Sequence, residues 1–169
     1  RSHFVHRDGE RLSFAPAEPC WIDLDEYDRL VAEGRRLAAS DSGAAIAAYE
    51  QAARLYRGDL LEDARYEDWP TAERERRREQ HLEMLESLAA LHASRRDYRG
   101  AIEVLQRILA LDRLREGVYQ DLIRYSLLRG DRAAALRAYR ICEQVLREEL
   151  GVTPHPHTRA LLEQVVGPA

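Results

Sequence analysis

The sequence predicts an all-α chain of about seven helices, arranged as helical hairpins and preceded by a short β-hairpin. Two observations support this class. All six prolines lie outside residues 71–153, so the strongest helix breaker is missing from the middle of the chain. Leu, Ile, Ala and Tyr recur in that stretch at helical spacing. A chain of 169 residues is long enough for one domain with a sizeable core, and it buries roughly 70% of its unfolded surface if compact.

Residues 3–14 differ from the rest of the chain because their pattern indicates two short strands. Asp8-Gly9 favours a two-residue type I′ turn, which places Val5 opposite Leu12. An isolated hairpin is marginal in water, so this one either packs on the helices or belongs to a domain missing from this chain. Residues 15–20 contain two prolines and form a linker by composition.

Glycines and N-capping residues divide the remainder of the chain into helices. One glycine, Gly34, lies inside the first predicted helix, where it costs ~1 kcal/mol relative to alanine. Another, Gly117, lies in the first turn of the fifth. The predicted helices cover about residues 24–39, 43–57, 70–95, 98–111, 115–129, 132–149 and 156–166.

An internal repeat makes the helical class more specific. Two sets of core positions superpose at an offset of 34 residues, which is the period of a tetratricopeptide repeat, and a third set with the same internal spacing begins 56 residues upstream. A small residue in each set lets two antiparallel helices approach, and a bulky one fills the gap to the next pair. The pattern predicts a tetratricopeptide-like solenoid of three helical hairpins; the alternative is an ordinary helical bundle whose helices share a period by chance. The repeat positions are Ala45, Tyr49 and Ala52, then Ala101, Leu105 and Ile108, then Ala135, Tyr139 and Cys142.

Charge and composition exclude several classes of protein. All 26 cationic residues are arginine, set against 30 Asp and Glu, and the net charge of -4 argues against nucleic-acid binding by this stretch alone. No run approaches the ~18 to 20 apolar residues of a membrane-spanning helix, and no signal-peptide core is present, so we expect a soluble, cytoplasmic chain without membrane contact. Cys20 and Cys142 lie far apart and indicate neither a disulfide framework nor a zinc site.

No catalytic pattern is present in the sequence. It lacks a Gly-rich phosphate loop, a nucleophile elbow and a paired-carboxylate site, so we predict no enzyme and no cofactor. His81 and His92 lie about 16 Å apart along one helix and cannot share a ligand. His155 and His157 flank a proline that prevents the arrangement of helical metal ligands, which predicts a polar turn and no metal site.

Aromatic residues are the best candidates for partner contacts. Most tyrosines of the repeats are expected in the core with the hydroxyl at its edge, and some are expected to line a groove that accepts a partner. Trp21 and Trp69 lie outside the repeats, each beside a proline-containing connection, where a tryptophan usually fills a joint between elements. The candidates for protein interaction are Tyr49, Tyr56, Tyr119, Arg124 and Tyr125.

Six segments, taken in order, resemble the bacterial transcriptional activator domain of the Streptomyces antibiotic regulatory protein family and related regulators. Each motif is weak alone, but the six occur in the family's order and cover about residues 20–166. The chain departs from the family at Arg113, where proline is common. The segments are Trp-Ile-Asp-Leu-Asp-Glu-Tyr (21–27), Leu-Tyr-Arg-Gly-Asp-Leu-Leu (55–61), Trp69 with the Glu/Arg-rich helix after it, Leu-Asp-Arg-Leu-Arg-Glu (111–116), Gly130 to Tyr139, and Glu-Leu-Gly-Val-Thr-Pro (149–154).

The resemblance implies a domain organisation and a set of partners. In that family the module follows an OmpR-type winged-helix DNA-binding domain that ends in a β-hairpin. Residues 1–14 then correspond to the end of such a domain, residues 15–20 to the linker and residues 21–169 to the activator domain. The family also implies a homodimer, contact with RNA polymerase or other regulator domains, and DNA contact only through the winged-helix domain, whose recognition helix this chain lacks.

We therefore predict a protein-interaction and oligomerisation module of a bacterial transcriptional activator, which positions an N-terminal DNA-binding domain. The alternative from another class is a stand-alone tetratricopeptide-type scaffold that binds a peptide and has no role in transcription. The hairpin discriminates between the two, because such a scaffold does not need a wing-like hairpin before its first helix. A third possibility places the module in a larger ATP-using regulator whose nucleotide site lies beyond residue 169.

Overall fold

The computed structural model describes residues 5–8, 11–14, 23–58 and 69–167. Within these ranges the seven predicted helices are present, and their bounds agree with the prediction to within two residues. The helices are α1 (Asp23–Leu37), α2 (Ser42–Leu55), α3 (Trp69–Ser94), α4 (Tyr98–Leu111), α5 (Glu116–Leu128), α6 (Arg132–Leu150) and α7 (Pro156–Val166).

Two short strands, β1 (Val5–Asp8) and β2 (Arg11–Phe14), pair antiparallel near the N-terminus. The register pairs Val5 with Phe14 and Asp8 with Arg11. This differs by two residues from the predicted register, in which Val5 faced Leu12. Both registers leave two residues between the innermost pair, so the turn signal alone does not distinguish them. Trp21 and the linker at 15–20 lie outside the described residues, as does the side chain of Trp69.

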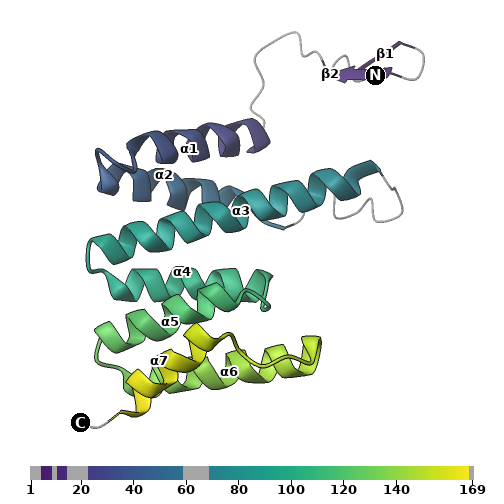
Figure 1. The fold of residues 1–169 in the computed structure, drawn as a ribbon. Helices are drawn as coiled ribbons and strands as arrows, with labels where there is room; N and C mark the ends of the chain where they lie inside the picture. Colours follow the sequence, from purple (N-terminus) through teal and green to yellow (C-terminus); the bar gives the residue numbers. More distant parts are fainter. Residues whose placement is uncertain (1–4, 9–10, 15–22, 59–68, 168–169) are drawn as a thin grey trace.

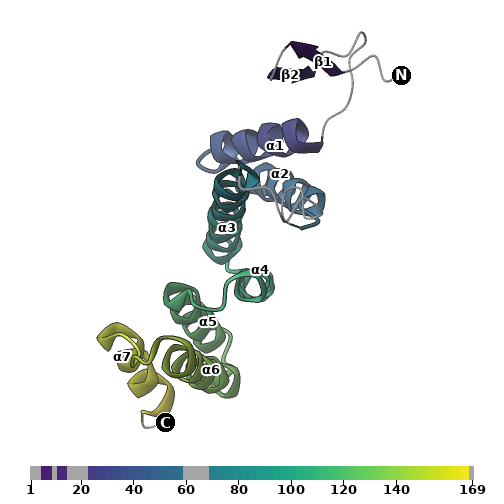
Figure 2. The same ribbon diagram turned by 90° about the vertical axis from the view of Figure 1, so that its right-hand side faces the viewer.

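The helices form a stack of hairpins (Figure 1). α1 packs on α2, α3 on α4 and α5 on α6, while α2 contacts α3 and α4 contacts α5 between neighbouring hairpins. α7 closes the C-terminal end of the stack by packing on α5 and α6. Figure 2 shows the stack from the side, with successive hairpins displaced so that the chain forms a solenoid. The arrangement is tetratricopeptide-like, as the repeat predicts.

Equivalent aspartates begin the second helix of each hairpin. The side chains of Asp41, Asp97 and Asp131 accept hydrogen bonds at 2.9, 3.0 and 2.8 Å from backbone N–H groups in the first turns of α2, α4 and α6. An N-cap of this kind satisfies a donor that the helix leaves unpaired. The three caps follow the 56- and 34-residue offsets of the repeat, so local capping and the packing pattern specify the same hairpin boundaries.

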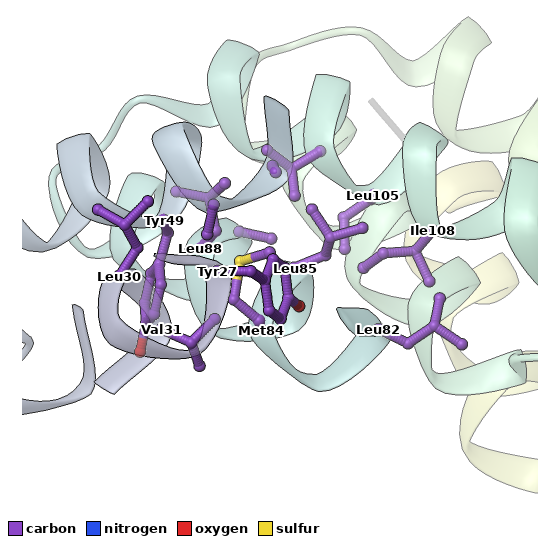
Figure 3. Packing of buried hydrophobic residues seen from close by; sticks show 14 of the residues in the cluster. Tyr27, Leu30, Val31, Tyr49, Leu82, Met84, Leu85, Leu88, Leu105 and Ile108 are labelled. Carbon is purple, nitrogen blue, oxygen red and sulfur yellow. The ribbon is translucent and has the colours of Figure 1, made fainter. Parts of the chain in front are cut away.

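The core is continuous through the first two hairpins (Figure 3). A second cluster joins α5, α6 and α7 around Ile123 and Leu161. All nine repeat positions lie in the interior, each with no more than 6% of its surface exposed. The small and the bulky members of each set are therefore all packing residues. Figure 3 shows Tyr49 among Leu30, Val31 and Leu88.

A carboxylate on α5 holds α7 in place. Glu116 accepts a hydrogen bond from the backbone N–H of His155 at 2.6 Å and another from the hydroxyl of Thr158 at 2.5 Å. Thr158 is fully buried, and its hydroxyl oxygen accepts from the side-chain amide of Gln120 at 2.8 Å. The predicted polar turn at His155 and Pro156 is therefore the N-terminus of a docked helix, and His155 is its N-cap.

The turns of the second and third hairpins share a backbone shape but differ in sequence. Each ends its helix with a left-handed residue followed by the capping aspartate. In the third hairpin the left-handed residue is Gly130, with φ of 80°, whereas in the second it is Arg96, with φ of 61°. A residue with a side chain pays roughly 1 to 2 kcal/mol for this conformation.

Replacing Arg96 with glycine is therefore expected to raise the free energy of unfolding by about 1 kcal/mol. Glycine removes the cost of the left-handed conformation, but it also gives the unfolded chain more conformational entropy, which offsets part of that gain. Urea denaturation of the two proteins measures the difference. The reverse change, Gly130→Arg, serves as the control and should lower stability by a similar amount. Stabilisation by both substitutions would contradict the explanation.

Candidate functional site

An open groove of about 450 Å³ lies between α3 and α5, the first helices of the second and third hairpins. We call it the α3–α5 groove. Its lining includes buried apolar residues from three helices, with charged side chains around them. The lining residues are Glu86, Ala89, Ala90, Leu105, Arg115, Gly117, Val118, Gln120, Asp121 and Arg124.

Helical spacing places these side chains on two facing surfaces. On α5, residues 117, 120, 121 and 124 follow an i, i+3, i+4, i+7 pattern and share one face. On α3, residues 86, 89 and 90 follow an i, i+3, i+4 pattern and also share one face. Between the two faces, the floor is apolar because Ala89, Leu105 and Val118 are buried.

Arg115 forms the centre of an ion-pair cluster of which only Arg115 itself and Glu86 line the α3–α5 groove. Its guanidinium donates to Asp112 at 3.0 Å and to Glu86 at 2.8 Å, and it also pairs with Glu79. Its side chain is 20% exposed, whereas those of Glu79 and Glu86 are 54% and 44% exposed. The carboxylates therefore lie nearer to solvent than the cation that they surround.

A second ion pair lies on the α5 side of the groove. Arg124 donates to Asp121 at 2.5 Å, and a second guanidinium N–H of Arg124 lies 3.5 Å from Nε2 of His157 on α7. Burial raises the pKa of Asp121, while the neighbouring charge of Arg124 acts in the opposite direction. The groove thus presents a partly desolvated carboxylate and a cation held beside it.

Only one of the five predicted contact residues lines the α3–α5 groove. Arg124 does so and is exposed, whereas Tyr49 and Tyr119 are 1% and 3% exposed and lie in the core. This differs from the prediction that those two tyrosines contact a partner: each follows its helix's apolar face inward. Tyr56 is half-buried and stacks on His81, and Tyr125 is half-buried and stacks on Tyr98.

Sequence reasoning missed most of the residues that line the α3–α5 groove. Arg115, Glu86 and Asp121 come from two helices and a connection, and no single segment unites them. The i, i+3, i+4, i+7 spacing of residues 117–124 was the available signal, because it marks a helix face that is neither apolar nor uniformly charged.

His81 is the centre of a buried polar cluster between the first two hairpins. Its Nδ1 lies 3.1 Å from the hydroxyl of Tyr27, and its ring stacks on Tyr56 with 3.8 Å between ring centroids. Burial, assisted by the charge of Arg107, lowers the pKa of His81 to about 4. The imidazole is therefore neutral near pH 7 and serves as a packing group with one hydrogen bond.

His92 has a separate structural role. Its Nδ1 lies 2.8 Å from a carboxylate oxygen of Asp97, the N-cap of α4, so the two histidines of α3 have different partners. Among the described residues, no three His, Cys, Asp or Glu side chains are arranged to hold a metal ion. None of the helices in the described part of the chain combines the length and the apolar character needed to cross a bilayer.

Comparison with known structures relates this fold to two proteins. A structure of Mycobacterium tuberculosis EmbR in complex with a low-affinity phosphopeptide superposes with a TM-score of 0.73 at 23% identity, covering 96% of this chain and 43% of the EmbR chain. The C-terminal tetratricopeptide-containing domain of a Plasmodium falciparum putative FK506-binding protein gives a TM-score of 0.58 at 15% identity, covering 86% of this chain and 91% of that one. At these identities the likeness concerns the fold.

Comparison of sequences identifies relatives and a family. The transcriptional regulator RedD of Streptomyces coelicolor is 33% identical over 138 residues, which cover 81% of this chain and 39% of RedD. The transcriptional regulatory protein MoaR1 of Mycobacterium tuberculosis is 29% identical over 163 residues, which cover 94% of this chain and 50% of MoaR1. This chain thus spans half or less of the length of the curated relatives that it matches.

The family match covers nearly all of the helical body. Residues 22–166 match the family described as the bacterial transcriptional activator domain, from the start of α1 to the end of α7. These bounds agree with the extent of the resemblance seen in the sequence. The chain therefore belongs to the bacterial transcriptional activator domain family, the module found in Streptomyces antibiotic regulatory proteins.

Proposed function

We propose that this chain is the regulatory, protein-interaction and oligomerisation module of a cytoplasmic transcriptional activator, and that it positions a DNA-binding domain N-terminal to it. The observation that carries the proposal is the α3–α5 groove, an open surface between the first helices of two neighbouring hairpins of a solenoid. Solenoids of this kind bind partners along exposed helix faces. Membership in a family of transcriptional regulators supports transcription as the process concerned.

The charge of the chain and its family together indicate which partners the module contacts directly. The chain has a net charge of -4, which disfavours direct electrostatic binding to phosphates. DNA contact therefore belongs to a winged-helix domain, for which residues 1–14 form the end. The helical module associates with a second copy and contacts RNA polymerase or another domain of the regulator.

Two measurements test this proposal together. Light scattering on residues 1–169 should show a concentration-dependent rise from monomer to dimer mass. Deletion of residues 21–169 from the full regulator should abolish promoter activation in a reporter assay while leaving the DNA-binding domain folded. A chain that stays monomeric, together with a truncated regulator of full activity, would contradict the proposal.

A stand-alone peptide-binding scaffold makes the opposite prediction for the reporter. Under that alternative the helical module binds a peptide, but deleting the module from the gene leaves promoter activity in the reporter assay unchanged. Sequencing of the region encoded before Arg1 gives an independent check, because winged-helix patterning there supports the transcriptional role.

A further inference from the structure

One side of α6 faces solvent along the whole helix. Residues 137, 141, 144 and 148 follow an i, i+4, i+7, i+11 spacing, which places them in one row, and all four are exposed. The buried residues of α6 lie on its other sides, where the helix packs on α5 and α7 (Figure 2). We call Arg137, Ile141, Gln144 and Glu148 the outer row of α6. Ile141 is 51% exposed, so the middle of the row presents an apolar side chain to water.

The charges of α6 are divided between its two halves. The first half has three arginines and no carboxylate, a formal charge of +3, and the second half has three glutamates and one arginine, a formal charge of -2. A helix dipole favours the opposite order, which α1 shows with acidic residues in its first turn and basic residues in its last. The net charge order of α6 therefore does not serve the helix itself. The residues are Arg132, Arg137 and Arg140, then Glu143, Arg147, Glu148 and Glu149.

The equivalent positions on α4 are paired inside the solenoid. Thirty-four residues before Arg137 and Ile141 stand Glu103 and Arg107. Glu103 pairs with Arg99 at 2.9 Å, and Arg107 pairs with Glu50 of α2 at 3.4 Å. Within the described part of the chain, Arg137 has no such partner, and Glu148 accepts only a hydrogen bond from Gln144 at 2.9 Å. The outer row of α6 thus keeps charges that the previous repeat neutralises internally.

The outer row is complementary to itself when a second copy of α6 lies antiparallel to it. A two-fold axis midway between Ile141 and Gln144 places Arg137 opposite Glu148 of the second copy, and Ile141 opposite Gln144 of that copy. The symmetry makes each contact occur twice. It also brings the basic half of each helix over the acidic half of the other, whereas a parallel pair would place like charges together.

We propose that two copies of this chain associate through the outer row of α6, as an antiparallel helix pair with two-fold symmetry. This inference rests on the proposed function, whose oligomerisation role it assigns to one helix face. A helix of 19 residues presents a strip of about 28 Å by 10 Å, which is small beside the roughly 800 Å² per partner of a stable interface. The dimer is therefore weak, and its population depends on the concentration of the chain.

Charge reversal on the two ends of the row tests the pairing. Arg137→Glu and Glu148→Arg should each raise the dimer Kd roughly threefold to thirtyfold, because each places like charges opposite each other twice. The double variant Arg137→Glu/Glu148→Arg should recover most of the lost affinity. The two residues are about 16 Å apart along one helix, too far to pair within a chain, so recovery requires contact between two copies.

Sedimentation equilibrium on residues 1–169 measures the Kd, at about 0.15 M salt, where repulsion between the net charges of -4 is screened beyond ~8 Å. Ile141→Gln should raise the Kd at least threefold by removing the apolar centre. Leu128→Gln is its matched control, because Leu128 is 57% exposed at the end of α5, away from the row. Arg54→Glu and Glu75→Arg change the net charge equally at exposed positions on other helices and should leave the Kd unchanged.

The possible results separate this inference from the proposed function. A dimer that none of the α6 variants weakens would overturn the assignment to α6 and leave the oligomerisation role standing. Weakening by both single charge reversals without recovery in the double variant would contradict the antiparallel pairing. A chain that stays monomeric at every concentration would overturn both the inference and the oligomerisation role, and the reporter assay on residues 21–169 decides the transcriptional role independently.

Discussion

Replacing Gly34 with alanine is expected to lower the free energy of unfolding by roughly 2 to 3 kcal/mol, although alanine is the better helix former. Gly34 is buried on α1 against the ring of Tyr49 on α2. A Cβ at Gly34 would lie 2.4 Å from Cε1 and 2.5 Å from Cδ1 of that ring, closer than real contacts allow. Since Tyr49 is 1% exposed and held in the core, α1 and α2 must separate to admit the methyl group.

Thermal unfolding followed by circular dichroism measures this effect, with an expected fall in melting temperature of about 4 to 12 °C. Gly117→Ala is the matched control, because that glycine also lies in a helix but has open space around it, and it should stabilise the chain by up to ~1 kcal/mol. Combining Gly34→Ala with Tyr49→Leu should recover part of the loss through coupling of the two sites. A stable Gly34→Ala variant would show that the two helices are not in close contact.

The stability of the chain is expected to fall as the pH drops from neutral towards 4, with a contribution of roughly 3 kcal/mol from His81. The pKa of His81 is about 4 in the folded chain, against 6.5 for the ordinary imidazole. Below pH 6.5 the unfolded chain therefore binds a proton that the folded chain does not accept. Protonation favours the unfolded state over this window, and the loss is complete below about pH 4.

Urea denaturation of the wild type and of His81→Gln at a series of pH values isolates this contribution. Glutamine has no charge to gain, so the difference in stability between the two proteins should shrink or change sign between about pH 7 and pH 4. His92→Gln is the control on the same helix and should keep the slope that His81 produces. Parallel pH profiles for the wild type and His81→Gln would show that His81 is solvated in the folded chain.

Local patterns determined the secondary structure of this protein. The capping aspartates, the turn glycines and the proline-free middle act within a few residues of the helix ends, so the helix bounds could be predicted to within two residues. The 34-residue repeat added the hairpin arrangement, since positions such as Ala101 and Ala135 recur only where successive helix pairs pack alike. Family membership followed from the order of the motifs, and the sequence comparisons confirm it.

The candidate site could be predicted only in part, because its residues are distant in sequence. Of the proposed contact residues, Arg124 lies in the α3–α5 groove, while Tyr49 and Tyr119 are buried. Helical periodicity does not say which neighbouring helix covers a given face, so it could not separate the buried tyrosines from exposed ones. Spacing relates Glu79 to Glu86 on α3 and Asp112 to Arg115 after α4, but nothing in the sequence indicates that these two pairs meet.

The sequence by itself thus determined the helices, their pairing into hairpins and the family, because these depend on periodic and local signals. Only the tertiary structure decided which charges meet, which aromatic rings are covered and why Gly34 is a glycine. Gly34 illustrates the difference. In the sequence, a glycine at this position destabilises its helix by ~1 kcal/mol relative to alanine. In the fold, glycine is the residue type that fits there, because any Cβ would clash with the ring of Tyr49. Such contacts depend on distances between helices, which the sequence pattern does not contain.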